Sequence, residues 1–451
     1  MLKREVTATF AANLFGAILT LGSFVILNRA LQPTGRGLLL LALLIPQTVA
    51  MFCNLGQVTV NSTYAGLYKE RRNQLFQQSV LIAAFTAAIS SLILFAFFFW
   101  LPIPKGRFGQ LDSDMISLTF LVAPVTSFSM IILSLVRGVG RITTAAKIHM
   151  VRSITLVIFL AVFLLWLKQG VKTAILIFIA EQVFVILISI FVLRDYISLR
   201  FSHFNGRFFQ KSLSFGLKIS LATLAGFLVY RIDQGILAYM VSEFQIGLYG
   251  VAVSLAEKLK LLPNSISSAF LPRLANELDA RQSQVPRVFR YTTIISFLSM
   301  LLLGLLGIPV IFVLCGRIYV GSIVPFLLLL PGIATLGGSG ILSSDLAARN
   351  KPKYSFYIGW TTLAINVALN FAWIPIMRIA GAALASTVCY AFAGVLWLIC
   401  YRKETQMPSR DMIPKADDVK YLWQQCLSLF RQIVKKLTKK QPGNGIKMQK
   451  E

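Results

Sequence analysis

Runs of about 20 apolar residues, separated by short polar stretches, recur along the whole chain. A helix rises about 1.5 Å per residue, so such a run can cross the roughly 30 Å hydrocarbon core of a bilayer. The pattern predicts twelve spanning helices, at residues 8–31, 38–60, 79–101, 115–136, 153–167, 173–193, 217–241, 247–272, 291–315, 318–344, 354–376 and 379–401. The expected fold class is therefore all-α, a polytopic membrane protein of about twelve transmembrane helices.

The polar connection between Arg194 and Leu217 is the longest in the spanning region, and it separates two sets of six helices. A short repeat supports this division, because residues 31–38 (LQPTGRGL) follow the first helix and residues 241–248 (VSEFQIGL) follow the seventh. An offset that spans an even number of helices implies a parallel repeat, with two lobes related by an axis along the membrane normal. We predict an N-terminal lobe at 1–205 (helices 1 to 6), a C-terminal lobe at 206–401 (helices 7 to 12) and a cytoplasmic tail at 402–451.

Composition and charge agree with a membrane protein. The chain has 451 residues, of which 56% are hydrophobic and only 14% are charged, whereas soluble domains carry about 25% charged residues. The net charge of +27 would suit a nucleic-acid partner, but the basic residues gather in alternate loops. That alternation follows the positive-inside rule, which places both termini in the cytoplasm and argues against nucleic acid. The five cysteines form no CxxC pattern, so neither a disulfide framework nor a metal site is expected.

The tail contains a basic amphipathic segment. Between residues 417 and 441, apolar residues recur at helical spacing and the opposite face is rich in lysine. Such a helix lies on an anionic inner leaflet, so membrane lipids are predicted partners of the tail, and a soluble protein partner is the alternative. We expect the membrane-spanning part to fold without the tail, because the twelve spans end before it.

Charged residues also occur deep inside the seventh and eighth predicted spans, which meet at the turn 242–247. They are Arg231, Asp233, Glu257, Lys258 and Lys260. Both groups lie roughly 13–15 Å from the turn, near the middle of the bilayer. Ionisable side chains at such depth face a partner or a watery cavity, and transporters place their binding sites there.

Three sets of short motifs, in a fixed order, carry a family resemblance. They are 29–37 (RALQPTGRG), then Asp233 with 246–252 (IGLYGVA) and 271–274 (LPRL), then 350–352 (NKP), 366–375 (NVALNFAWIP) and 381–383 (GAA). With these motifs, the chain resembles Wzx-type flippases, in the polysaccharide-transporter branch of the multidrug/oligosaccharidyl-lipid/polysaccharide (MOP) exporter superfamily. The resemblance covers residues 1 to about 401.

The resemblance implies two six-helix lobes around a central cavity that opens alternately to each side. It implies a cargo of polyprenyl-diphosphate-linked oligosaccharide repeat units, moved across the bacterial inner membrane for surface polysaccharide such as O-antigen, capsule or exopolysaccharide. A polysaccharide polymerase and chain-length proteins would be possible partners. No cofactor is implied.

An anionic diphosphate needs cationic and hydrogen-bonding groups around it. The candidate substrate-binding residues are Arg231, Lys258, Lys260, Arg29, Arg36, Asn366 and Asn370. The candidate ion-coupling residues or charge partners are Asp233, Glu257, Glu181 and Asp345. Residues two apart on a helix point about 200° away from each other, so we expect Arg231 to face the cavity and Asp233 to pair with Lys258.

Structural roles remain open for each set. Arg231 and Lys258 can simply neutralise nearby carboxylates, Arg29 and Arg36 can snorkel to the interface, and the asparagines can pack helices together.

Enzymatic activity has little support in the sequence, which shows no phosphate loop, nucleophile motif or metal-ligand spacing. The two histidines, His149 and His203, fall in expected cytoplasmic loops. A membrane polymerase or ligase would present a large outer loop, whereas the longest expected here is about 101–114. A cation-coupled multidrug exporter of the same superfamily is the main alternative, although it would favour carboxylates without basic groups at mid-depth. A lipid II flippase is a third alternative. The expected number of helices, twelve rather than fourteen, argues against it.

Overall fold

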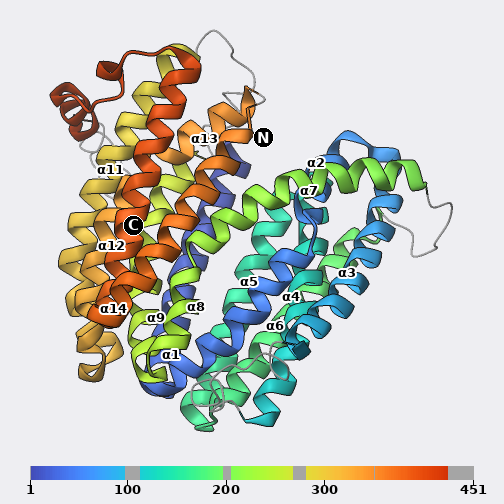
Figure 1. Ribbon diagram of the computed structural model, residues 1–451. Helices are drawn as coiled ribbons and strands as arrows, with labels where there is room; N and C mark the ends of the chain where they lie inside the picture. Colours follow the sequence, from blue (N-terminus) through green and yellow to red (C-terminus); the bar gives the residue numbers. More distant parts are fainter. Residues whose placement is uncertain (1, 97–111, 197–204, 268–280, 350, 425–451) are drawn as a thin grey trace, which may run out of the picture.

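The computed structural model describes residues 2–96, 112–196, 205–267, 281–349 and 351–424. Every regular element in these ranges is a helix, so the predicted all-α class is confirmed. Nine of the described helices are long and apolar enough to cross a membrane. Figure 1 shows two bundles that approach each other at the bottom of the view, where α1 bends and α8 meets α9, and diverge toward the top.

The N-terminal bundle is drawn in blue to blue-green in Figure 1. It contains α1 (Leu2–Cys53), α2 (Gln57–Leu67), η1 (Lys69–Arg71), α3 (Arg72–Phe95), α4 (Ser113–Gly138), α5 (Ile142–Leu160), the π-helix η3 (Ala161–Trp166) and α6 (Val171–Leu193). The following helices are α7 (Gly206–Val229), α8 (Ile232–Met240), α9 (Glu243–Ala256) and η4 (Glu257–Lys260). The C-terminal bundle is drawn in yellow to red and contains α11 (Arg281–Val310), η5 (Ile311–Cys315), η6 (Arg317–Ser322), α12 (Ile323–Thr335), α13 (Ser339–Ala348) and α14 (Lys353–Thr405), followed by η7 (Ser409–Asp411).

Two of the nine helices each hold two predicted spans. In α1 the chain turns at Gln32, whose φ of 56° and ψ of 175° are not helical, and Pro33 follows directly. In α14 the corresponding break is Arg378, with φ of 53°. Eleven of the twelve predicted spans therefore lie wholly or mainly in the nine apolar helices. The remaining one, 247–272, starts in α9 and continues through η4 as far as the described residues extend.

Several of the predicted borders are wrong. The span expected at 38–60 is interrupted after Cys53, and the one expected to begin at 291 lies in a helix described from Arg281 onward. The fifth helix begins at Ile142 rather than at 153, because His149 and Arg152 lie on helical turns that line a cavity instead of forming a loop. The seventh helix begins at Gly206 rather than at 217, and it is interrupted at Tyr230 and Arg231 before α8 continues.

The start of α7 packs on the N-terminal bundle. Phe208 is buried against Tyr64 and Tyr68 of the α2 region, and Gln78 of α3 donates a hydrogen bond to Ser212 at 2.6 Å. The second half of α7 instead runs along α14, and Figure 1 shows the helix extending across α2. The lobe boundary at 205/206 stays a prediction, but a helix that follows it has contacts with both bundles.

The described part of the tail, up to residue 424, is packed onto the helices of the C-terminal bundle, and the folding of the core without the tail stays a prediction. Met412 is 4% exposed in an apolar cluster with Phe289 of α11 and Leu342 of α13. The guanidinium of Arg290 holds both carboxylate oxygens of Asp418, at 2.6 and 3.1 Å. Val419 and Trp423 are exposed, as a membrane-facing side would be, but most of the predicted amphipathic helix 417–441 lies outside the described residues.

Candidate functional site

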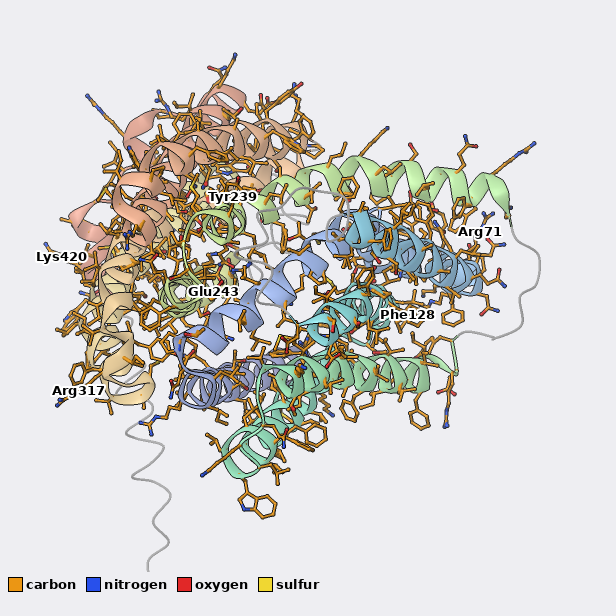
Figure 2. The ribbon with its side chains drawn as sticks, turned by 60° about the horizontal axis from the view of Figure 1, so that its bottom comes forward. Arg71, Phe128, Tyr239, Glu243, Arg317 and Lys420 are labelled. Atoms are coloured by element: carbon orange, nitrogen blue, oxygen red, sulfur yellow. The ribbon has the colours of Figure 1, made fainter. Side chains whose placement is uncertain are left out.

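The two copies of the internal repeat meet each other where the bundles converge. A Cβ atom added to Gly37 would overlap the carbonyl of Glu243, and one added to Gly247 would overlap the carbonyl of Pro33. In the repeat, Gly37 corresponds to Gly247 and Pro33 to Glu243, so the contact is reciprocal, as at a two-fold interface. Figure 2 shows Glu243 at the start of α9, beside α1. We call these four residues the seam.

A cavity of about 600 Å³ lies between the two halves of the chain. Its walls come from α1, α5 and α6 on one side and from α8, α9 and η4 on the other. Its polar lining residues are Thr20, Ser23, Arg36, Gln47, His149, Arg152, Ser153, Glu181, Arg231, Gln234, Ser254, Glu257 and Lys258. The cavity therefore joins charged residues that are more than 200 positions apart in the sequence.

The cavity wall carries an excess of positive charge. Four cations, Arg36, Arg152, Arg231 and Lys258, face two carboxylates, Glu181 and Glu257, which leaves two formal positive charges when histidine is neutral. The guanidinium of Arg152 is paired with Glu181. This arrangement suits an anionic ligand and disfavours a cationic one.

Arg231 reaches the cavity because the helix is broken next to it. With φ of −130° it lies outside helical geometry, between α7 and α8. Its Nη2 lies 3.4 Å from Glu257 Oε2, and Lys260 Nζ lies 3.2 Å from the other carboxylate oxygen. The ammonium of Lys260 also lies 3.4 Å from the centroid of the Tyr230 ring. Lys260 is thus engaged by two protein groups and does not line the cavity.

Two of the cavity cations, Arg36 and Lys258, form no salt bridge with any described residue. The Nε atom of Arg36 is buried without a hydrogen bond. Lys258 lines the cavity with no salt bridge to any residue in the described part of the chain. A buried donor without an acceptor costs roughly 1–3 kcal/mol, and more when it is charged, so the position of Arg36 favours occupancy by an anion. Lys258 is half-buried and adds a second positive charge to the same cavity.

Asp233 lies behind the cavity wall. It is 1% exposed and accepts hydrogen bonds from the Tyr249 hydroxyl at 2.5 Å, from the Ser386 hydroxyl at 3.1 Å and from the Gln234 amide at 2.7 Å. The expected division, with Arg231 on the cavity and Asp233 on a helix neighbour, agrees with this geometry. The expected partner is wrong, because Asp233 bonds to these groups and not to Lys258.

The remaining candidates lie away from the cavity. Arg29 donates to the carbonyls of Val313 and Leu314, both at 2.8 Å, and so caps the end of η5. Asn366 and Asn370 are fully buried and bond to each other. Asp345 is fully buried and accepts from Arg349 at 2.8 Å and from Tyr401 at 2.7 Å. These contacts are those of helix packing, and a role in transport for these residues stays a prediction.

Sequence reasoning missed part of the cavity wall. His149 and Arg152 were assigned to a loop, but they lie on α5 and line the cavity with Ser153. The spacing i, i+3 and i+4 places all three on one helix face, which was the available signal. His203 lies outside the described residues. Within the described residues, no group of three or more His, Cys, Asp or Glu side chains is arranged to hold a metal ion.

The fold has counterparts among solved membrane proteins. The chain shares its fold with solved transporters of the MOP superfamily. A lipid II flippase MurJ in an inward closed conformation matches with a TM-score of 0.69 and 15% identity, over 90% of this chain and 88% of that one. An inward-facing multidrug resistance transporter of the MATE family matches with a TM-score of 0.67 and 13% identity, over 88% and 98%.

Sequence comparison then gives the family. Residues 2–277 match the model of the polysaccharide biosynthesis protein family, and the chain belongs to this family. A curated relative, named probable flippase AglR, from Haloferax volcanii, is 25% identical over an alignment of 192 residues. This alignment covers 39% of this chain. The match spans 38% of the length of that relative. The family resemblance that the motifs indicated is thus confirmed, and the fold is shared with transporters of the MOP superfamily.

Proposed function

We propose that this protein is a transporter that flips polyprenyl-diphosphate-linked oligosaccharide repeat units from the cytoplasmic to the outer leaflet, for surface polysaccharide such as O-antigen, capsule or exopolysaccharide. Membership of the polysaccharide biosynthesis family supports the pathway, and the names of two similar proteins, a probable flippase and a lipid II flippase, support the activity. The observation that carries the proposal is a pair of cations, Arg36 and Lys258, that line the cavity between the halves and form no salt bridge with the described residues.

The charge of the cavity fits this cargo. A diphosphate diester carries two negative charges, and the lining residues leave two formal positive charges. Removing an ion from water costs several kcal/mol even in a relaxed protein site, so a cavity that lowers this cost must present cations. Arg231 can hold phosphate oxygens with two parallel N–H groups, and Lys258 acts as a point charge. The same cation excess opposes a cation-coupled drug exporter.

The proposed cycle is alternating access. The seam closes one end of the space between the halves, and the positive-inside rule assigns the loops of the seam to the outer face. The cavity then communicates with the cytoplasm in this state, and both termini are cytoplasmic, in a bacterial inner membrane. Transfer to the outer leaflet requires the seam to separate. Polymerase and chain-length proteins would receive the product.

Transport in vesicles tests the proposal. The purified protein is reconstituted into liposomes with a lipid-linked oligosaccharide, and exposure of the glycan to an impermeant lectin measures flipping. Arg36→Ala combined with Lys258→Ala is expected to lower the rate more than tenfold. Arg317→Ala serves as control, because this exposed arginine lies outside the described cavities, and Figure 2 shows it at the edge of the C-terminal bundle.

The two possible failures can be told apart. Equal melting temperatures of the variants exclude misfolding as the cause of a lost rate. If the double variant is folded and flips at the rate of the control, the cavity cations do not contact the cargo and the proposal fails.

A further inference from the structure

An apolar groove adjoins the charged cavity. It encloses about 300 Å³ between the second half of α1 and the junction of α7 with α8. Its lining residues are Leu41, Leu44, Ile45, Thr48, Val49, Leu228, Arg231, Ile232, Gly235, Ala238 and Tyr239. The hydroxyl of Thr48 donates to the carbonyl of Leu44 at 2.8 Å, so this polar side chain is satisfied by its own helix. The groove therefore presents an almost entirely apolar surface.

The groove and the cavity share part of their walls. Arg231 and Leu44 line both spaces. At this point the surroundings change from six charged side chains on the cavity side to Arg231 alone on the groove side. A ligand that occupied both spaces would need an anionic end near Arg231 and an apolar chain directly attached to it.

We infer that the groove between α1 and the α7–α8 junction binds the first isoprenoid units of the cargo lipid while its diphosphate lies in the charged cavity, and that Arg231 marks the boundary between the two subsites. The inference rests on the proposed function, since it assigns a place to the lipid part of the same cargo. An apolar chain that followed its headgroup into the charged cavity would lose favourable burial with every methylene group. With the groove occupied, the isoprenoid chain stays in apolar surroundings while the diphosphate lies in the charged cavity, so this burial is not lost.

Gly235 offers a way to fill the groove without disturbing its walls. It lines the groove on α8, and a Cβ atom added to it meets nothing within 4 Å. Leucine at this helical position is also favoured over glycine by intrinsic helix propensity. Gly226, on α7, has the same open space for a Cβ atom but does not line the groove. Gly235→Leu and Gly226→Leu are therefore a matched pair.

Binding of two soluble probes separates the subsites. The full chain in lipid nanodiscs is titrated with inorganic diphosphate and with farnesyl diphosphate, and empty nanodiscs correct for partitioning. We expect the wild-type protein and Gly226→Leu to bind farnesyl diphosphate at least tenfold more tightly than diphosphate. Tenfold corresponds to about 1.4 kcal/mol, or the burial of about two methylene groups. Gly235→Leu should lose most of this preference while its affinity for inorganic diphosphate stays within twofold of wild type.

The outcomes distinguish this inference from the proposed function. If diphosphate binds but farnesyl diphosphate binds no more tightly, or if Gly235→Leu keeps the full preference, the groove is not the chain subsite and the inference is overturned alone. If the wild-type protein binds neither probe, the anionic subsite is absent and the proposed function fails with it. A fall in the affinity of Gly235→Leu for both probes also overturns the inference, because the groove and the cavity would then not be separate subsites.

Discussion

Substitution of Gly37 by alanine should shift the protein away from the state described here. The added Cβ would overlap the carbonyl oxygen of Glu243 and would lie 2.8 Å from its carbonyl carbon and 3.2 Å from its Cα. Ordinary contacts lie at 3.4–4 Å, so α1 and α9 would have to separate by more than about 1 Å at this point. Overpacking of this kind costs roughly 1–3 kcal/mol. It would lower the population of molecules with a closed seam, relative to those with an open seam, about 5- to 150-fold.

The distance across the seam measures this shift. Thr34 and Phe244 are exposed on its two sides and can be replaced by spin-labelled cysteines for distance measurements by electron paramagnetic resonance. The wild-type seam should give a short distance, and Gly37→Ala should add a longer component. Gly226→Ala is the control, because it makes the same substitution within a helix where a Cβ meets nothing within 4 Å.

The reciprocal contact allows a second, independent trial. Gly247→Ala should have the same effect as Gly37→Ala, because its Cβ would meet the backbone of Pro33 in the equivalent way. Distance distributions of Gly37→Ala and Gly247→Ala that coincide with those of the control would refute the reasoning. The seam would then have room for a methyl group and would not be a tight closure.

Three further predictions concern individual charges. Arg231→Lys should retain only part of the flipping rate of wild type, since a point charge lacks the bidentate geometry of guanidinium, and a full rate would contradict a phosphate contact. Asp233→Ala should lower the melting temperature strongly, because two buried hydroxyl groups lose their acceptor at about 1–3 kcal/mol each, and an unchanged melting temperature would contradict this. Burial would raise the pKa of Asp418, but hydrogen bonds from Arg290 and from the Lys415 amide outweigh it and hold the pKa below the usual 3.8. Because the pKa of Asp418 is lowered in the folded protein, its interaction with Arg290 stabilises the folded form fully above about 3.8, and this stabilisation is lost as the pH falls through the lower pKa. The described part of the tail, residues 402–424, should therefore stay protected from protease from pH 8 to 5 and become cleavable only below about 3.8. Asp418→Asn should be cleaved at every pH, and cleavage of wild type already at pH 6 would show that this pair does not hold the tail.

Most of the fold was predictable because the length of each apolar run and the charge of each loop can be read from neighbouring residues in the sequence. The errors arose where polar residues face the interior of the protein. A hydropathy window averages over all faces of a helix, so Arg152 counted as part of a loop although its helix begins ten residues earlier. The same averaging hid the break at Arg231, which interrupts the helix without lowering the apolar content around it.

The site was predictable only in part, since its contacts connect distant residues. The charge cluster of residues 231–260 identified one wall of the cavity. The opposite wall, with Arg36, Arg152 and Glu181, depends on how the halves meet. The partner of Asp233 is Ser386, 153 residues away, together with Tyr249, and no local spacing indicates such a pair.

The position of α7 has a mechanical consequence. Its 24 residues make a lever arm about 36 Å long, fixed at one end on α2 and running at the other along α14. A tilt of one bundle by about 15°, the scale of known subunit rotations, would displace the far end of a rigid arm by roughly 9 Å. If the bundles rock as the proposed function requires, either the aromatic contacts around Phe208 must slide or α7 must bend. A molecule that bound the exposed basic side chains Arg207 and Lys211 would restrain the N-terminal end of α7. It would thereby slow the motion of the bundles without entering the cavity.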